Sequence, residues 1–164
     1  MEHYRFTLDR AFLAEYYPVL EDCARFFLDT LCRCEDGTVR VTPSLSPENV
    51  FLAKDGNRAA LCDDAAMDQQ ILHELFQGVV ESGEILGRDV APYRELLTKL
   101  RPVTIGDDGR VLEWFDGNKE ETEKGHRHVS HLYALYPGHQ ITSATAFCRK
   151  NRLCRYGKPF QLPD

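Results

Sequence analysis

The spacing of hydrophobic residues near the start of the chain predicts helices. Between residues 12 and 31 these residues recur at steps of three and four, which is typical of a helix that buries one stripe. A proline breaks a helix interior but fits a first turn, so Pro18 predicts a short helix ending near Tyr16 and a longer one from Pro18 to about Arg33. A turn at Glu35-Asp36-Gly37 is predicted to follow the longer helix. The stripe consists of Phe12, Leu13, Tyr16, Leu20, Cys23, Phe27 and Leu31.

Helical spacing returns in three later segments. The first begins after a pair of aspartates that suit a helix start and stops at Gly87. The second occupies residues 89–101, where an aspartate and a proline suit the first turn and Arg101-Pro102 ends the helix. The third runs from His126 to Tyr136 and is closed by a Pro-Gly pair. The chain therefore predicts an all-α protein.

The segments between the predicted helices have no regular period. Residues 38–63 contain prolines and glycine, and only two valines suggest a brief strand. A long irregular loop inside a compact domain is often functional. Residues 116–124 form a charged stretch that predicts a surface loop, and residues 142–164 are basic, weakly patterned and predicted to pack poorly.

Composition narrows the class of partner. The 164 residues suffice for one ordinary domain of about 100 to 200 residues. The net charge of −6 comes from 26 acidic and 20 basic residues without a basic block, which disfavours nucleic acid and anionic membranes and favours an uncharged substrate. No run of about 18 apolar residues occurs, so no membrane span is expected. The first residues do not resemble a signal peptide, and the sequence does not indicate a cellular compartment.

The cysteines predict free thiols. They are scattered, form no C-x-x-C pair and are too few for a disulfide scaffold, so we expect them to be reduced and mostly buried. The six are Cys23, Cys32, Cys34, Cys62, Cys148 and Cys154.

Glu48 is a candidate proton donor. Pro47 stiffens the chain before it and so fixes the direction of the carboxyl group. A general acid must also stay protonated at neutral pH, and a hydrophobic rim of Leu45, Val50 and Phe51 could achieve this by desolvation. The alternative is an ordinary solvated loop residue or a helix cap.

Three imidazoles lie within six residues, at His126, His128 and His131. In a helix the last two would share a face, which suits zinc. The segment nevertheless lacks the H-E-x-x-H pattern, and Arg127 and Ser130 between the histidines suit hydrogen bonding to hydroxyl groups equally well. A polar pocket wall is the favoured interpretation, with a metal protein and plain surface residues as alternatives.

Glu113-Trp114 carries the only tryptophan of the chain. An indole can pack on the apolar face of a sugar ring while the adjacent carboxylate binds hydroxyls, although a single tryptophan is more often a core residue. Asp68 falls in a first helical turn, where a carboxylate is favoured by the helix dipole, so we expect it to support the helix start.

Six short motifs, in this order, resemble the catalytic domain of glycoside hydrolase family 95, the 1,2-α-L-fucosidases and related α-L-galactosidases. Together they cover about residues 2–141. They are Glu2-His3-Tyr4 with Phe6-Thr7, Phe26-Phe27-Leu28-Asp29, Pro43-Ser44-Leu45-Ser46-Pro47-Glu48-Asn49, Met67-Asp68-Gln69-Gln70-Ile71, Glu113-Trp114, and His126-Arg127-His128-Val129-Ser130-His131-Leu132 with Leu135-Tyr136-Pro137-Gly138.

The resemblance implies an (α/α)6 barrel, of which residues 1–141 would form part, followed by an aberrant segment at 142–164. It implies an inverting hydrolase without metal or organic cofactor, in which Glu48 is the general acid and a fucosylated oligosaccharide or glycan is the substrate. The side chains expected to contact the sugar are Asn49, Glu113, Trp114, Arg127, His128 and His131.

The second catalytic group of such a hydrolase is not expected in this chain. An inverting glycosidase holds two carboxyl groups about 6.5 to 9.5 Å apart. The family takes its water-activating residues from stretches that the chain does not contain, including one near a Thr-Gly-Trp-Ser motif. We therefore expect the chain by itself to be inactive or nearly so. The alternatives are an inert carbohydrate-binding remnant or, less favoured, a metal protein that uses the three histidines.

Overall fold

The computed structural model describes residues 1–115, 119–123 and 125–142. The predicted aberrant segment therefore lies outside the described residues from 143 onward, as do parts of the predicted surface loop at 116–124. The chain divides into two compact units, which are described separately. The helical unit contains Met1–Arg40 and Leu72–Arg101, and the loop unit contains Val41–Ile71 and the chain from Pro102 onward.

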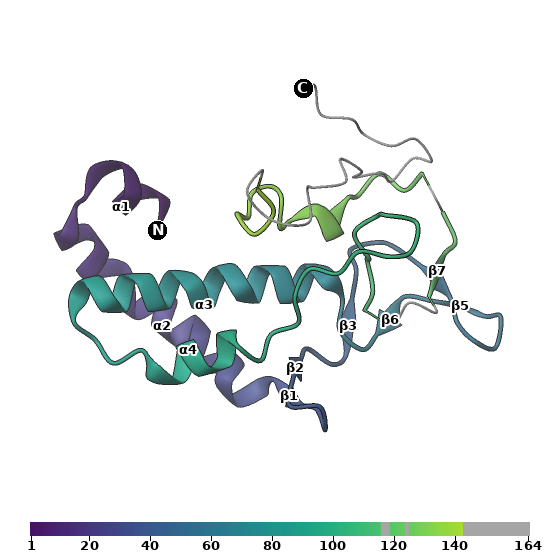
Figure 1. Ribbon diagram of the computed structural model, residues 1–164, viewed down its shortest axis with the longest axis horizontal. Coiled ribbons are helices and arrows are strands. Elements are labelled where there is room, and N and C mark those ends of the chain that lie inside the picture. The colour runs from purple at the N-terminus through teal and green to yellow at the C-terminus, as the bar shows by residue number, and fades with distance from the viewer. Residues whose placement is uncertain (116–118, 124, 143–164) are drawn as a thin grey trace. The chain divides into compact units, whose positions relative to one another are not determined.

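The long elements of the chain are helices (Figure 1). They are α1 (Glu2–Thr7), α2 (Arg10–Thr30), α3 (Ala66–Leu86) and α4 (Ala91–Leu97). The carboxylate of Asp9 caps α2 by accepting a 2.9 Å hydrogen bond from the backbone N–H of Phe12. Among the described residues, no helix is both long and apolar enough to cross a membrane.

The predicted helix break at Pro18 is wrong, because α2 continues through it. A proline inside a helix costs about 3 kcal/mol through a missing hydrogen bond and a ring clash. Pro18 is exposed, as is Ala14 one turn earlier, so water can solvate the carbonyl that loses its partner. Burial of Leu13, Tyr17 and Ala24 on another face stabilises the uninterrupted helix.

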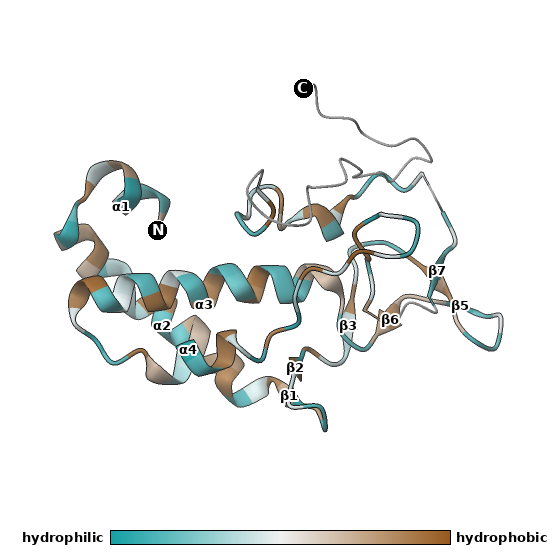
Figure 2. Cartoon of the chain, viewed as in Figure 1, coloured by the Kyte–Doolittle hydropathy of each residue, from teal (hydrophilic) through white to brown (hydrophobic). Residues whose placement is uncertain are grey.

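The helical unit has a hydrophobic core to which α2, α3 and α4 contribute. Figure 2 shows hydrophobic residues recurring along α3 between hydrophilic ones, as the helical spacing predicts. The rings of Phe76 on α3 and Tyr93 on α4 stack with centroids 6.4 Å apart. The buried hydrophobic side chains of this unit are Leu13, Tyr17, Ala24, Val39, Leu72, Phe76, Val79, Val80, Val90, Tyr93, Leu96 and Leu100.

A small hairpin follows α2 in place of its predicted last turn. Strand β1 (Cys32–Arg33) pairs antiparallel with β2 (Val39–Arg40). The turn predicted at Glu35-Asp36-Gly37 is confirmed, and Gly37 has a φ of 83°, which glycine adopts at little cost. The helix therefore ends at Thr30 and not near Arg33.

The loop unit contains strands that the sequence pattern did not predict. Strand β3 (Ser44–Leu45) pairs with β6 (Leu61–Cys62), and β4 (Phe51–Leu52) lies between β5 (Arg58–Ala59) and β7 (Glu120–Glu121). Each strand has two residues, which is too short to show an alternating pattern. The all-α prediction thus holds for the long elements of the described chain. It omits the small antiparallel sheets, apart from the brief strand suggested by Val39, which β2 confirms.

The helix predicted at His126 to Tyr136 is also wrong. Only a 3₁₀ turn forms there, η1 (Ser130–Leu132). Two hydrophobic residues at the helical spacing of this segment, Val129 and Tyr136, are exposed, so no hydrophobic face holds the segment in a helix.

The described cysteines are free, but the prediction that most are buried is wrong. Cys62 is buried and Cys34 is partly buried, whereas Cys23 and Cys32 are exposed. Cys148 and Cys154 lie outside the described residues.

A close approach at Gly83 of α3 gives a stability prediction. A Cβ atom there would lie 2.3 Å from Cγ1 of Val90 and 3.0 Å from the hydroxyl of Tyr17, whereas at Gly78 it would meet only the Cγ of Met1, at 3.3 Å. Gly83→Ala is expected to destabilise the protein by about 1–2 kcal/mol, because overpacking exceeds the gain in helix propensity. The matched variant Gly78→Ala should be neutral or slightly stabilising. Urea unfolding followed by circular dichroism measures both, and equal effects would contradict the packing argument.

Candidate functional site

Glu48 lies at the tip of a tight turn in the loop unit. The backbone N–H of Asn49 donates a 3.1 Å hydrogen bond to the carbonyl of Ser46, with Pro47 and Glu48 between them. Glu48 has a φ of 54°. Proline in the second position and a positive φ in the third are the features of a type II turn, which normally has glycine in the third position. The predicted stiff loop is present, and it holds Glu48 in a strained conformation.

The carboxylate of Glu48 has two cationic or polar neighbours. It forms an ion pair with the guanidinium of Arg127, and its Oε2 lies 3.1 Å from Nε2 of His128. The hydrogen bond with His128, followed by the charge of Arg127, lowers the pKa of Glu48 below its ordinary value. The side chain is 58% exposed. The expected desolvation by a hydrophobic rim is therefore wrong, because the carboxylate is solvated and paired with these two groups.

Glu113 has the opposite environment. Its side chain is only 6% exposed, and it accepts a 2.6 Å hydrogen bond from the hydroxyl of Ser46. Its second oxygen lies 3.2 Å from Nδ1 of His131, which is equally buried. Burial alone would raise the pKa of Glu113, but the hydrogen bonds from His131 and Ser46 outweigh burial and lower the pKa to about 2. Glu113 is therefore an anion at neutral pH.

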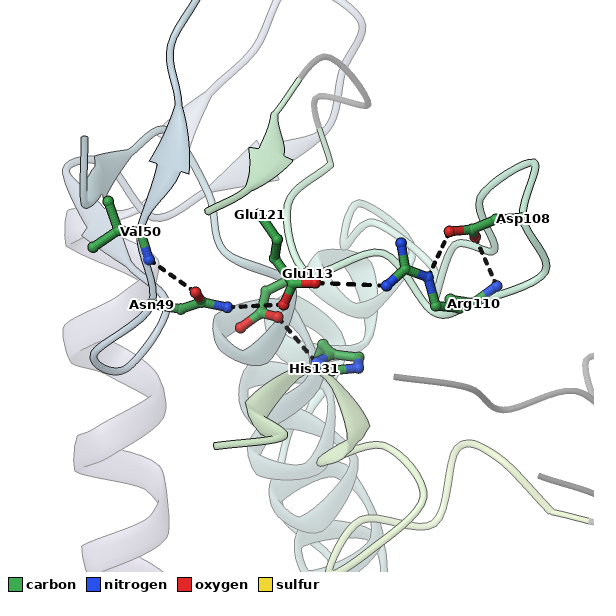
Figure 3. A network of polar contacts seen from close by, with 7 residues as sticks. All are labelled: Asn49, Val50, Asp108, Arg110, Glu113, Glu121 and His131. Carbon is green, nitrogen blue, oxygen red and sulfur yellow. Dashed lines mark hydrogen bonds and ion pairs between the residues drawn. The ribbon is translucent and has the colours of Figure 1, made fainter. Parts of the chain in front are cut away.

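A second polar network extends from Asn49 (Figure 3). The side-chain amide of Asn49 donates to Glu121 at 3.1 Å, and its oxygen accepts from the backbone N–H of Val50 at 2.9 Å. Glu121 also faces the guanidinium of Arg110 at 3.5 Å, and Arg110 bonds to Asp108 at 2.5 Å. Sequence reasoning missed Glu121 and Arg110 because they lie in charged stretches that resemble solvated loops.

Trp114 lies in a hydrophobic cluster and not on an open surface. Its ring packs edge-on against Phe51 with centroids 5.2 Å apart, and Cys62 and Ala65 complete the buried cluster. The backbone of Trp114 also forms an antiparallel bridge with Ala65. The contact of Trp114 with a sugar ring stays a prediction, and the burial of the indole ring does not favour it.

The three histidines have different neighbours. His128 contacts Glu48, His131 contacts Glu113, and Nδ1 of His126 accepts from the backbone N–H of His128 at 3.2 Å. Within the described part of the chain, no three histidine, cysteine or acidic side chains are placed to bind one metal ion. The shared helical face on which the metal alternative depended does not form.

Asp68 lies in the first turn of α3 and supports the start of this helix. It accepts a hydrogen bond from Ser44, and burial raises its pKa. The hydroxyl of Ser44 in turn accepts from the backbone N–H of Ala65 at 3.2 Å. These bonds connect β3 to the start of α3.

Two groups of predicted site residues are thus brought together in the loop unit. Glu48, Arg127 and His128 form an exposed cluster with opposite charges. Glu113 and His131 form a buried pair, and Asn49, only 1% exposed, joins the second network. The exposed cluster is the part of the site that a polar, uncharged ligand could reach.

A known family matches these features. The model of the glycosyl hydrolase family 95 catalytic domain matches residues 1–151. The match covers most of the chain, which therefore belongs to glycosyl hydrolase family 95, as its motifs predicted.

Curated relatives agree with the family. The chain is 41% identical over 146 residues to "Alpha-L-fucosidase 2" of Arabidopsis thaliana, a match that covers 86% of this chain and 17% of the relative. It is 33% identical over 153 residues to "Probable alpha-fucosidase A" of Aspergillus niger, with 87% of this chain and 18% of that protein covered. The match thus spans less than a fifth of either relative.

The buried pair predicts a specific acid sensitivity. The folded pKa of Glu113, about 2, lies below the ordinary value of 4.5, so its charge stabilises the fold above pH 4.5 and this contribution is lost as the pH falls towards 2. Glu113→Gln should lower the free energy of unfolding by about 2–3 kcal/mol at neutral pH and flatten its dependence on pH in this window. Urea unfolding at a series of pH values tests this, with Glu15→Gln on the exposed surface of α2 as the control. An unchanged slope for Glu113→Gln would contradict it.

The positive φ of Glu48 gives a second prediction. A side chain other than glycine costs roughly 1–2 kcal/mol in this conformation, and replacement by glycine removes that cost while adding chain entropy to the unfolded state. Glu48→Gly should therefore be more stable than Glu48→Ala by about 1 kcal/mol. Both variants lose the carboxylate, so their difference isolates the backbone. Thermal unfolding of both variants measures this difference. A more stable alanine variant would contradict the prediction and show that the turn adopts another backbone conformation.

Proposed function

We propose that this chain is part of an inverting α-L-fucosidase-like catalytic domain and that Glu48 is its general acid. The observation that carries the proposal is the placement of Glu48 at the tip of a fixed turn, against the guanidinium of Arg127 and the imidazole of His128. A general acid must reach the leaving oxygen in a fixed direction, which such a turn supplies. The match to family 95 and the names of the relatives support the reaction class.

Arg127 and His128 are proposed to bind the sugar. Both side chains are partly or largely exposed and carry N–H donors that suit hydroxyl and ring oxygens. Terminal α-linked L-fucose of an oligosaccharide or glycan is the proposed substrate, since the relatives are named for that sugar. An uncharged sugar also agrees with a chain of net charge −6 that has no basic block.

Proton donation requires the pKa of Glu48 to rise when the sugar binds. In the free protein the hydrogen bond with His128 and the charge of Arg127 lower the pKa of Glu48, which favours its ionised form. A bound sugar would exclude water and draw these two groups toward its own oxygens, and both changes disfavour the charged form. The same side chains would then bind the substrate and release the carboxyl group to be protonated.

The water-activating group is proposed to lie elsewhere in the whole enzyme. Glu113, which is close in sequence to other site residues, is buried and occupied by Ser46 and His131, so it is not a candidate base. An inverting enzyme that lacks one member of its acid/base pair loses a factor of about 10²–10⁴ in rate. We therefore propose that the 164-residue chain alone hydrolyses no fucoside at a measurable rate, although it retains weak binding.

Titration of Glu48 in the presence of sugar tests the proposal. The pKa of the ¹³C-labelled Glu48 carboxyl, measured by NMR, should lie below the ordinary glutamate value and rise on saturation with a 2′-fucosylated oligosaccharide, with a dissociation constant of about 1 mM or weaker. The carboxyl of Glu95, whose pKa is lowered by its hydrogen bond with Lys99, is the internal control and should not respond. Lactose is the matched ligand without fucose.

The outcomes separate the candidate functions. A rise that is lost in the Arg127→Ala variant supports a sugar-binding general acid, and saturable binding with no change at Glu48 would leave only a carbohydrate-binding module. Absence of any saturable response to the fucosylated sugar would overturn the proposal. Release of fucose above the level of Glu48→Gln, measured by chromatography, would contradict the proposed inactivity of the chain while supporting the role of Glu48.

A further inference from the structure

The turn that presents Glu48 is held by buried hydrogen bonds on both sides of the exposed residue. Before it, the hydroxyl of Ser46 donates to Oε1 of Glu113 at 2.6 Å. After it, the amide of Asn49 donates to Glu121 at 3.1 Å. Ser46 and Asn49 are each only 1% exposed. The position of the Glu48 backbone therefore depends on partners that lie outside the turn.

Glu113 is itself fixed at both its backbone and its side chain. Its carbonyl accepts a 3.0 Å hydrogen bond from the backbone N–H of Ala66, at the start of α3. Its second carboxylate oxygen is occupied by Nδ1 of His131. His131 is anchored in turn, because its carbonyl accepts from the side-chain amide of Gln70 on α3 at 2.8 Å. The hydroxyl of Ser46 thus bonds to a group that has little freedom to follow the turn.

We propose that Glu113 is a positioning residue, which acts through the hydroxyl of Ser46 to hold the turn in the strained conformation that sets Glu48 against His128 and Arg127. This inference rests on the proposed role of Glu48 as the proton donor. It replaces the expected direct contact of Glu113 and His131 with the sugar, because both side chains are buried and already paired.

The strain at Glu48 is the reason that such a residue is required. A glutamate at a φ of 54° stays there only when the surroundings determine its backbone. The proline before it fixes only its own φ, and the single backbone hydrogen bond across the turn spans just these residues. The bonds of Ser46 and Asn49 to Glu113 and Glu121 supply the remaining constraint.

Two buried serines of the same segment provide a matched test. Ser46 donates to Glu113, whereas Ser44 donates to Asp68 at the start of α3. Ser46→Ala removes the link to Glu113 but keeps the pair of Glu113 with His131. Ser44→Ala removes a buried hydrogen bond of the same chemistry that does not reach Glu113. Loss of stability alone is expected for both variants and does not distinguish them.

The pKa of Glu48 is the measurement that distinguishes them. The charged or titratable groups that face Glu48 are Arg127, His128 and, at longer range, His126. In Ser46→Ala the pKa of Glu48, followed by ¹³C NMR in the whole 164-residue chain, should rise toward its ordinary value, and the contact between Glu48 and the His128 ring should weaken. Ser44→Ala should leave both unchanged. Binding of the fucosylated oligosaccharide should weaken about three- to tenfold in Ser46→Ala only.

A second variant tests the same hydrogen bond by changing Glu113 in place of Ser46. Glu113→Asp keeps the charge but withdraws it by one methylene, so it should raise the pKa of Glu48 as Ser46→Ala does. Wild-type values of this pKa in both variants, with the fold retained in the ¹H–¹⁵N spectrum, would overturn the proposal. So would an equal rise in Ser44→Ala, because the effect would then be general loosening of the loop.

Failure of this inference is separable from failure of the proposed function. If the sugar raises the pKa of Glu48 in the wild-type chain but Ser46→Ala behaves identically, only the positioning role fails. If Ser46→Ala shifts the pKa of Glu48 but no fucosylated sugar binds, the positioning role stands and the proposed function fails.

Discussion

The candidate site depends on one buried negative charge. An ionised carboxylate is expensive to bury unless donors replace its water shell, and Glu113 has two such donors in Ser46 and His131. These two residues come from segments more than 80 positions apart in the sequence, so the charge joins distant parts of the loop unit at one point. A hydrophobic contact of the same area would stabilise the loops but would not fix their orientation, since it has no preferred direction.

This arrangement divides the polar residues into two sets with different tasks. The buried set is paired internally and shielded from solvent, so its role in this structure is to hold the loops. The exposed set, Glu48 with Arg127 and His128, has partners that water or a sugar hydroxyl can replace at little cost. A site that must bind and release a neutral ligand needs both properties, and the two-residue turn between Ser46 and Asn49 connects them.

The sequence predicted the features that depend on long repeats or on strong local signals. The helical period of α3, its end at Gly87 and the turn at residues 35–37 all appear in the structure. Pro18 was misjudged because its cost is offset by burial on another face of α2, which a local rule does not include. The two-residue strands carry no period, and the histidine segment has the spacing of a helix without the burial that would stabilise one.

The arrangement of the candidate site residues was not predictable from the sequence. Motifs placed Glu48, Glu113 and the histidines in one site, yet no pattern shows that Glu113 is buried while Glu48 is solvated. Burial is decided by contacts between segments remote in the sequence, and the same residue type can have its pKa moved in either direction by them. The partners Glu121 and Arg110 were missed for a related reason, because a charge that will be buried by tertiary pairing looks like any surface charge in the sequence.

The lowered pKa of Glu48 has a consequence for the proposed role of this residue as the acid of a whole enzyme. Each unit by which its pKa must rise to give a protonated acid at neutral pH costs about 1.4 kcal/mol. That free energy has to come from the binding of the substrate, including contacts remote from the reacting bond. Among the described residues, the exposed cluster offers Arg127 and His128 for this purpose, and under the proposed function each would give up part of its interaction with Glu48 to bind the sugar. Other groups that bind the sugar are therefore needed to raise the pKa of Glu48 far enough. Catalysis would then require both a fixed orientation of the acid and a sugar-binding surface larger than the exposed cluster.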